Sequence, residues 1–451
     1  MSHVGEAVAR YHKILESDSY KNSAWTAELL ERMKAHQLLV GDKPVSPFLR
    51  PHFLTKRQDA SLVKASESLL TSIRRVRDLV LKTPALMSRM ELLPAEKMLA
   101  AVNPGYSHLT VNSQLHVNVN GELTFTGYSA DMASGIAYAD GLADIFYDSA
   151  PGKEFRKKHH LKKMAGMKHL LSASLKAWKE FGGKKLPNVA ILEFKQPFTT
   201  VENHEHHLIA ELFRANGYKT EVVWPEQLDC KGDGALRKGD FTIDIVLRRV
   251  KAREFLIRYD LTHPLVRAYR EGKVCLINSF QAELAQKRAM FDLLSDDAIT
   301  GSFPAAERKV IREHIPWTRM VTQAKVTRDG HVIDLPDYIL KNRQKLTLLP
   351  NDDGGEQQSF DGALMTDQTW ERALRTALRN PYVLRERLEP TMDRFPVLQW
   401  GSVDMKDVRL DLRPQAFLGK VQSFSAYLSP GSAQGFSTVT GVAPVFLLDS
   451  K

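Results

Sequence analysis

The central part of the chain alternates short apolar runs with a segment of helical spacing. Residues 188–194, 219–224 and 241–247 are apolar runs bounded by turn-forming residues, and residues 202–216 repeat their apolar positions as an amphipathic helix does. Strands that alternate with helices in this way usually form a parallel sheet. The pattern therefore predicts an α/β unit in the centre of the chain.

The two ends of the chain carry different patterns. Residues 1–40 have helical spacing, whereas residues 409–448 alternate like β-strands between turns rich in Gly, Ser and Thr. Residues 115–125 alternate apolar and polar positions around Asn120-Gly121, a dipeptide that favours a tight hairpin turn. Residues 134–147 then read as a helix behind a serine cap. We expect a helical N-terminal region and a β-rich C-terminal region.

Charge adds little to this picture. The 451 residues are 43% hydrophobic, enough for a buried core, and 63 Lys and Arg against 53 Asp and Glu give a net charge of +10. The basic residues are scattered apart from Lys153 to Lys168, which lies on a long amphipathic helix predicted over 154–181. Aromatic residues that stack on bases are not interleaved there. We interpret the run as a solvated helix face and do not expect nucleic-acid binding.

Redox and membrane chemistry are not indicated. The two cysteines, Cys230 and Cys275, are too few for a disulfide framework or a thiolate zinc site. No segment approaches the ~18 uninterrupted apolar residues of a membrane span. The N-terminus lacks a basic region followed by an apolar stretch. We expect a soluble, cytoplasmic protein without a membrane partner.

The segment that points most directly to chemistry is 347–355, Thr-Leu-Leu-Pro-Asn-Asp-Asp-Gly-Gly. An apolar strand runs here into a proline, two carboxylates and two glycines. Glycines let backbone N–H groups approach a phosphate, and carboxylates hold Mg²⁺. The layout is typical of a loop that lies over phosphates.

This strand and loop resemble the glycine loop of ATP-grasp ligases. The chain is most similar to the circularly permuted branch related to glutathione synthetase and glutathionylspermidine synthetase, whose pattern it follows over roughly 48–448. The other motifs that carry the resemblance are Arg50-Pro51-His52-Phe53-Leu54, Ile243-Asp244-Ile245-Val246-Leu247-Arg248-Arg249-Val250, Asn278-Ser279-Phe280 followed by Lys287, His314-Ile315-Pro316-Trp317-Thr318-Arg319, and Pro381-Tyr382-Val383-Leu384-Arg385-Glu386. The resemblance implies an α/β, glutathione synthetase-like ATP-grasp fold in circularly permuted order.

The resemblance also implies a division of the chain. Residues 1–110 would form an N-terminal helical region, and residues 111–185 a hairpin with helices that belongs to the ATP-grasp core. Residues 186–277 would form an α/β substrate lobe. Residues 278–451 would form the nucleotide-cleft lobe, with its glycine loop at 350–355.

Site residues follow from the same resemblance. Arg50 would hold a substrate carboxylate, because a guanidinium bonds both oxygens. The residues implied in nucleotide binding are Lys287, Gly354, Gly355 and Glu386, the last at the adenine hinge. Asp353 and Asp411 are the remaining metal candidates.

Several positions depart from the family pattern. Gly127 and Ser129 stand where the family has a Glu-x-Asn pair for Mg²⁺, and Leu349 replaces a lysine that reaches the phosphates. An arginine expected in the C-terminal strand falls on Tyr427. The candidates for compensation are Asp352 and Asp353 for the metal, and Lys341 and Lys345 for the phosphate.

Two hypotheses remain. Loss of one electrostatic partner lowers the rate by a factor of about 10²–10³. Several such losses favour a protein that is related to the ligases but catalytically impaired or non-catalytic. Such a protein would bind a ligand or a partner protein, for example an active ligase. Such a relative needs no cofactor. The alternative is an active ligase that uses ATP and Mg²⁺ to join a small-molecule carboxylate and an amine through an acyl phosphate.

Other constellations are weak. His204-Glu205-His206-His207 has the spacing of metal ligands, but it opens a predicted helix, and we prefer a solvated helix face. No Ser-His-Asp order, Walker loop or Rossmann fingerprint is evident.

Overall fold

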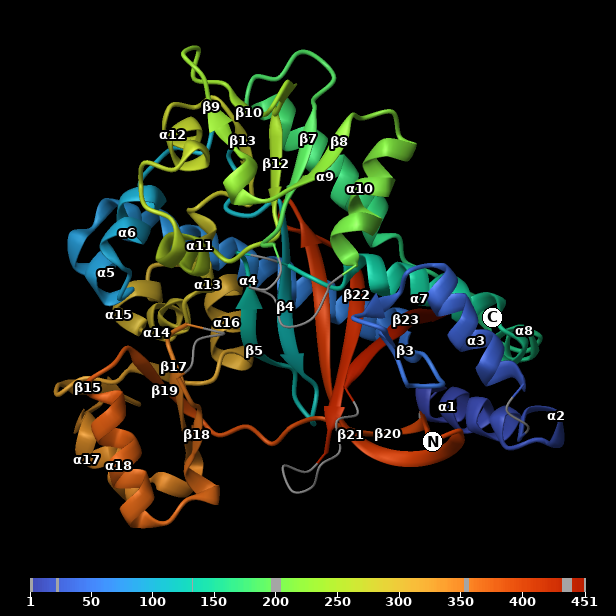
Figure 1. Ribbon diagram of the computed structural model, residues 1–451. Helices are drawn as coiled ribbons and strands as arrows, with labels where there is room; N and C mark the ends of the chain where they lie inside the picture. Colours follow the sequence, from blue (N-terminus) through green and yellow to red (C-terminus); the bar gives the residue numbers. More distant parts are fainter. Residues whose placement is uncertain are drawn as a thin grey trace.

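A computed structural model describes residues 3–21, 24–131, 133–195, 204–352, 357–431 and 440–449. Three sheets organise these residues, and helices cover them (Figure 1). We refer to them as the body sheet, the parallel sheet and the small sheet. No helix in the described ranges is long and apolar enough to cross a membrane.

The body sheet has eight strands and is mainly antiparallel. Its main path runs in the order β3-β23-β22-β21-β4-β5, with β20 paired to β21 and β6 paired to β23. The strands are β3 (His52–Thr55), β4 (Asn112–Asn118), β5 (Thr124–Ser129), β6 (His160–Lys162), β20 (Met392–Gln399), β21 (Ser402–Phe417), β22 (Lys420–Pro430) and β23 (Gly441–Asp449). The predicted hairpin over 115–125 and the β-rich C-terminal region are confirmed as parts of this sheet.

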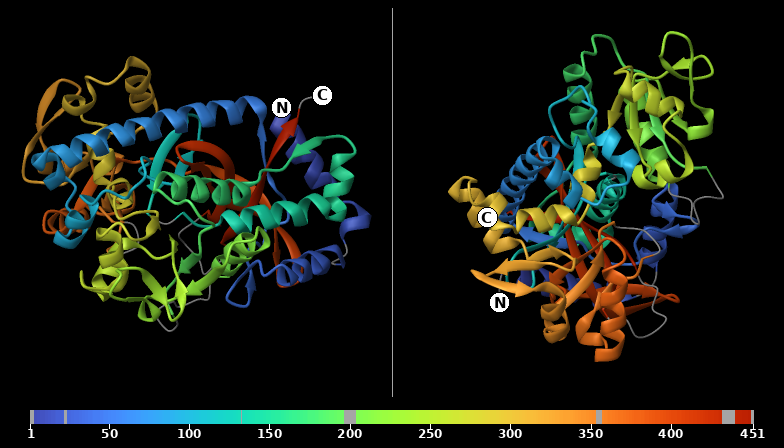
Figure 2. Two further views of the ribbon diagram at one scale, coloured as in Figure 1. Left: turned by 90° about the horizontal axis from the view of Figure 1, so that it is seen from above. Right: turned by 90° about the vertical axis from the view of Figure 1, so that its left-hand side faces the viewer.

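The two faces of the body sheet differ. One face packs its apolar side chains, among them Leu115, Val117 and Leu412, against α4 (Lys56–Lys82). Helix α4 runs across most of the width of the molecule when it is seen from above (Figure 2). Because side chains alternate along a strand, the residues between these apolar positions lie on the opposite face. At β3 and β23 that second face packs apolar side chains against α1 (His3–Leu15), α3 (Ala24–Ala35) and α7 (Ile136–Asp148), whereas at β4, β5 and β21 it is polar and carries the candidate site.

The predicted parallel sheet is confirmed. Its order is β13-β12-β7-β8, and all three pairings are parallel. Its strands are β7 (Val189–Leu192), β8 (Thr220–Val223), β12 (Ile245–Arg248) and β13 (Cys275–Ile277). Helices cover both faces, as the continuous apolar strands require. These helices are α9 (Gly166–Glu180) and α10 (Glu205–Ala215) on one face, and α11 (Ala252–Arg258) and α12 (Pro264–Arg270) on the other.

The small sheet contains the strand that precedes the predicted glycine loop. Its order is β14-β19-β17-β18, from β14 (Thr318–Met320), β17 (Leu346–Pro350), β18 (Phe360–Asp361) and β19 (Tyr382–Glu386). Helices α17 (Leu335–Lys341) and α18 (Asp367–Ala377) pack on it through an apolar cluster that includes Trp370. Residues 353–356, which include Asp353, Gly354 and Gly355, lie outside the described residues.

The remaining helices and short strands connect these sheets. The N-terminal and middle helices are α1 (His3–Leu15), α2 (Asp18–Lys21), α3 (Ala24–Ala35), α5 (Pro84–Arg89), α6 (Pro94–Ala100), α7 (Ile136–Asp148) and α8 (Ala150–Arg156). The later ones are α13 (Ala282–Gln286), α14 (Ala289–Leu294), α15 (Asp297–Thr300) and α16 (Ala305–His314). Three small hairpin-like sheets use β1 (Leu39–Val40), β2 (Lys43–Pro44), β9 (Asp229–Cys230), β10 (Leu236–Lys238), β11 (Phe241–Thr242), β15 (Lys325–Arg328) and β16 (His331–Asp334).

Two helix predictions are wrong. The single helix expected over 154–181 is divided, because residues 160–162 join the body sheet as β6 and a new helix begins at Gly166. The carboxylate of Asp140 accepts the N–H groups of Gly166 and Met167 at 3.1 and 2.8 Å and so caps that new start. The N-terminal stretch is likewise divided into three helices and a short strand.

Candidate active site

Polar and ionisable side chains from three strands come together on the polar face of the body sheet. Strand β4 contributes Gln114 and His116, and its neighbour β21 contributes Asp411 and Arg413. On the other side, a register shift in β5 places Phe125 opposite Val117 and Gly127 opposite His116. Through this bulge Phe125 stays in the core, while a side chain at 127 would lie over His116.

His116 links two of these strands to its own. Its Nε2 lies 2.8 Å from the Ser129 hydroxyl, and its Nδ1 lies 3.3 Å from a carboxylate oxygen of Asp411. Arg413 donates from Nε to the same oxygen at 2.7 Å. Burial alone would raise the pKa of Asp411, but the hydrogen bond and charge of His116 and the charge of Arg413 outweigh it and hold that pKa below its usual value.

This arrangement does not suit Mg²⁺. The resemblance places the metal at the positions of Gly127 and Ser129, where the chain offers no carboxylate. Asp411, a predicted metal ligand, is already shared by an imidazole and a guanidinium. Mg²⁺ needs an octahedral set of oxygens, with carboxylates that are not bound by cations. On the described part of this face, the donor set resembles a hydrogen-bonded catalytic network more than a metal site.

A second polar centre lies at the end of β17. The ammonium of Lys287 lies 3.0 Å from Glu96, 2.7 Å from Glu283 and 2.5 Å from Asp352, and its side chain is 0% exposed. Arg253 donates to the other oxygen of Asp352 at 2.6 Å. These groups come from α6, α13, α11 and Asp352 of the predicted glycine loop. We call Lys287 with Glu96, Glu283 and Asp352 the Lys287 cluster.

Burial and opposing charges shift two pKa values within the Lys287 cluster. Burial raises the pKa of Glu283 to about 8, against the lowering effect of Lys287. Burial opposes the charge of Lys287, yet its three acidic neighbours together raise its pKa. The three carboxylates are close enough to share a metal ion, but the ammonium of Lys287 already lies among them. A phosphate would have to compete with Asp352 for this lysine, and the role predicted for Lys287 in ATP binding stays a prediction.

The small sheet contacts the body sheet directly beside Gly127. Arg385 on β19 donates to the carbonyl oxygen of Thr126 on β5 at 2.7 Å. Burial, together with the nearby charge of Arg288, lowers the pKa of Arg385 to about 10. A cavity of about 50 Å³ remains between His116, Gly127 and Arg288. Ligand sites for drug-sized molecules usually have about 300–1,000 Å³, so this cavity admits only a small group.

The other predicted site residues have structural partners. Arg50 is fully buried, lies 2.8 Å from Asp393 and stacks 3.5 Å above the ring of Phe395. Glu386 accepts from Arg328 at 2.6 Å. Their predicted roles in substrate and adenine binding stay predictions. Arg50, Lys287, Glu386 and Asp411 thus each contact a different set of partners.

The prediction of a solvated helix face for residues 204–207 is wrong in part. Glu205 is buried, pairs with Arg249 at 2.5 Å, and accepts the N–H groups of Gly135 and Ala137 at 2.9 and 3.1 Å. Those N–H groups begin α7, so Glu205 supplies the cap that the sequence suggested for a serine. The sequence showed the acid but not its partners, which lie 44 to 70 residues away.

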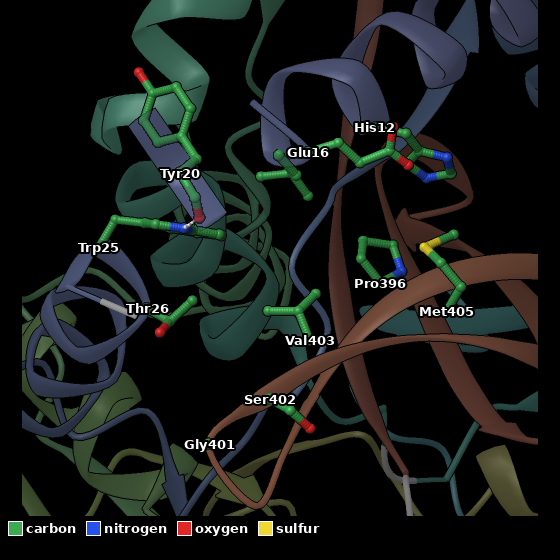
Figure 3. Close-up of a pocket in the computed structure, with 11 residues that line it drawn as sticks. His12, Glu16, Tyr20, Trp25, Thr26, Pro396, Gly401, Ser402, Val403 and Met405 are labelled. Carbon is green, nitrogen blue, oxygen red and sulfur yellow. Dashed lines mark hydrogen bonds between the residues drawn. The ribbon is translucent and has the colours of Figure 1, made fainter. Parts of the chain in front are cut away.

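A separate and larger pocket lies beside the N-terminal helices (Figure 3). It measures about 510 Å³, and α1, α3 and the β20–β21 hairpin form its walls. Its lining is largely apolar, with Trp25, Val403 and Met405, while His12 and Glu16 add polar groups. This size and lining are typical of small-molecule sites. Sequence patterns gave no signal for it, because the hairpin is some 380 residues from the helices.

Comparison with known proteins defines the class of fold. No protein-family model matches the chain, and no curated protein matches it. Among solved structures, the fold is that of a glutathione synthetase-like protein. The glutathione synthetase-like effector from Globodera pallida, solved in its apo form, superimposes with a TM-score of 0.60 at 11% identity, covering 94% of this chain and 96% of the effector.

More distant similarities are weaker. A putative gamma-glutamylcysteine synthetase from Methylobacillus flagellatus KT gives a TM-score of 0.42 at 10% identity, covering 85% of this chain and 86% of that protein. A RimK domain ATP-grasp protein from Sphaerobacter thermophilus gives 0.30 at 16% identity, covering 57% and 90%. The predicted glutathione synthetase-like α/β fold is confirmed, and its circularly permuted order stays a prediction.

Proposed function

We propose that this chain is a glutathione synthetase-fold protein that has lost most of its capacity for ATP-dependent ligation and acts by binding a ligand or a partner protein. The observation that supports this most directly is the state of Asp411. Its carboxylate is engaged by His116 and Arg413, on a face where Gly127 and Ser129 replace the expected metal ligands. Phosphoryl transfer depends on metals and cations that neutralise the phosphates, and this face offers no free acid to hold the metal among its described residues.

The 50 Å³ cavity and the Arg385 contact support the same proposal. A nucleotide between the two sheets would have to break the hydrogen bond from Arg385 to Thr126. The 510 Å³ pocket beside the N-terminal helices is an alternative site for a ligand, and binding there would not require a nucleotide. Under this proposal the protein requires neither ATP nor Mg²⁺.

One observation favours the alternative of an active carboxylate–amine ligase. Glu96 and Glu283 converge on Asp352 of the predicted glycine loop, and Lys287 and Arg253 lie beside them. Acids and cations near that loop are the groups that a relocated Mg²⁺·ATP site would need. In the described structure, however, they neutralise one another. The ligase hypothesis requires that ATP and Mg²⁺ separate Lys287 from its carboxylates.

Calorimetric titration with ATP, with and without Mg²⁺, tests the two functions. We expect no heat of binding up to millimolar ATP. We also expect no ADP release when mixtures of amino acids, short peptides and polyamines are added as carboxylates and amines. Tight Mg²⁺-dependent binding together with substrate-dependent ADP release would overturn the proposal and support the ligase.

A variant that restores the expected groups tests whether this face is an ATP site that has lost its ligands or is not an ATP site. Leu349→Lys, Gly127→Glu and Ser129→Asn restore the groups that the resemblance expects, and His116→Asp removes the imidazole that engages Asp411. We expect this variant to gain Mg²⁺-dependent ATP binding that the unmodified protein lacks. Its melting temperature, measured in parallel, shows whether the altered sheet still folds.

A further inference from the structure

Three side chains lie in a row on the polar face of the body sheet, joined by one hydrogen bond and one ion-pair contact. The Ser129 hydroxyl lies 2.8 Å from Nε2 of His116, and Asp411 lies 3.3 Å from Nδ1 of the same ring. They come from three different strands, β5, β4 and β21, which the sheet places side by side. We call Ser129, His116 and Asp411 the His116 row.

The order of groups in the row has chemical meaning. When Nδ1–H of His116 is donated to Asp411, Nε2 is left as an acceptor for the Ser129 hydroxyl proton. A nucleophile within about 2.6–3.2 Å of a base, with that base oriented by an acid, is the arrangement that activates serine in unrelated folds. His116 and Arg413, which contact the same carboxylate oxygen of Asp411, together hold its pKa below the usual value and so favour its ionised form.

Space and charge next to the row fit a reacting group. Gly127 leaves the surface above His116 open, since even a Cβ at 127 would lie 3.6 Å from the imidazole. The adjoining 50 Å³ cavity is also lined by Arg288. Arg385, bound to the carbonyl of Thr126, has a buried Nε without a hydrogen-bond partner among the described residues. Arg288, which also donates to the carbonyl oxygens of Pro350 and Asp352, therefore lines the cavity, and Arg385 is bonded to Thr126, another of its lining residues. We expect the acyl oxygen to face these two guanidinium groups.

We propose that Ser129, His116 and Asp411 form a nucleophilic triad that hydrolyses esters or thioesters of small acyl groups. Ser129 and His116 are the catalytic residues, and Asp411 is a positioning residue. The size of the cavity limits the acyl group to a few non-hydrogen atoms, while the alcohol or thiol part extends toward solvent. The activity is independent of ATP and does not rest on the proposed loss of ligation.

The reaction balances with water as the second reactant. The Ser129 oxygen attacks the acyl carbon while His116 Nε2 takes the hydroxyl proton. The C–O or C–S bond then breaks, and the leaving alcohol or thiol takes that proton from Nε2. Water attacks the resulting acyl-serine ester, again giving a proton to Nε2. Cleavage of that ester releases the carboxylic acid and returns the proton to Ser129.

Covalent labelling tests the proposal on the full chain. A fluorophosphonate probe phosphonylates an activated serine with loss of fluoride, and intact-mass and peptide analysis locate the adduct. We expect one adduct per chain, on Ser129, and turnover of p-nitrophenyl acetate. Ser129→Ala and His116→Gln should each lose the adduct and at least about 100-fold of the turnover rate. Ser429→Ala is the matched control, because Ser429 lies on β22 of the same sheet and has no histidine partner in the described part of the chain. It should label as the unmodified protein does.

Asp411 requires a readout that a purely structural role does not move. We expect Asp411→Asn to lower kcat for p-nitrophenyl acetate with little change in KM, and Asp411→Glu to recover part of kcat. A folded, unmodified protein that takes up no probe would overturn the triad, as would labelling that persists in Ser129→Ala. Neither result depends on whether ATP binds, so failure of the triad and failure of the proposed loss of ligation remain distinguishable.

Discussion

The Lys287 cluster and the His116 row both occupy regions where the family resemblance expects ATP and Mg²⁺, yet they use their charges differently. In the Lys287 cluster the lysine and Glu96 are 0% exposed, and the charges are balanced within the protein. In the His116 row the side chains of His116 and Asp411 are 17% and 34% exposed. The first joins three segments of the fold, whereas the second remains within reach of a small molecule.

This difference teaches where to look for function. Removing one partner of a buried ion pair leaves an uncompensated charge in a medium of low dielectric constant. The remaining charge then destabilises the folded state. Half-exposed polar groups contribute little to stability, because water replaces their partners. We therefore interpret the Lys287 cluster as a structural junction and the His116 row as the place where chemistry is retained.

The largest effect should follow from removing the lysine. Lys287→Met leaves Glu96, Glu283 and Asp352 without their shared cation, and we expect the free energy of unfolding to fall by about 3–5 kcal/mol. Urea denaturation followed by circular dichroism measures this change. The matched control is Lys341→Met, because Lys341 pairs with Asp337 on the exposed face of α17 and should change stability by less than ~0.5 kcal/mol. Equal effects of the two substitutions would refute the assignment of a structural junction.

A contrast between local signals and distant partners explains which parts of the fold the sequence could predict. The hairpin at Asn120-Gly121 and the parallel sheet follow from local signals, namely a turn dipeptide and continuous apolar strands. The break within 154–181 does not, because Asp140 caps the new helix from 26 residues away and β6 pairs with the far C-terminal strand. Tertiary partners overrode a helical pattern that was locally sound.

The candidate site was less predictable than the fold. The loss of metal ligands at Gly127 and Ser129 was visible in the sequence, because the resemblance fixed what to expect there. The His116 row was not, since its members are separated by 13 and 282 residues and only the strand register joins them. Lys287 was identified as a ligand contact, but the three acids around it come from segments that no sequence pattern connects.

An intermediate effect should appear as a pH dependence of stability. Burial raises the pKa of Glu283 in the folded protein to about 8, above its ordinary value of 4.5. The folded state therefore holds this proton more tightly than the unfolded state does. The resulting stabilisation is fully present below pH 4.5 and is lost as the pH rises through about 8. Between pH 5 and 8 we expect a loss of up to about 3 kcal/mol.

Glu283→Gln isolates this contribution from the titration of histidines. Glutamine keeps the shape of the protonated acid but has no proton to lose, so the variant should show a flatter dependence of unfolding free energy on pH over the same interval. Denaturation midpoints measured at pH 5, 6, 7 and 8 for both proteins provide the comparison. An unchanged slope in the variant would show that Glu283 is already ionised at neutral pH.

The smallest effect on stability should come from adding a methyl group beside the His116 row. Two glycines next to this face of the sheet, Gly127 and Gly135, should respond differently to this change. At Gly127 a Cβ would lie 3.6 Å from His116, which is ordinary contact, and the strand backbone suits any residue. Gly127→Ala should thus be neutral or stabilising by about 0.4–1 kcal/mol, since alanine restricts the unfolded chain. At Gly135, φ is +84° and a Cβ would overlap the Tyr427 hydroxyl, so Gly135→Ala should cost more than ~2 kcal/mol. Thermal unfolding of both variants decides the point, and a large loss in Gly127→Ala would mean that the space above His116 is already filled, which leaves no room for an acyl group.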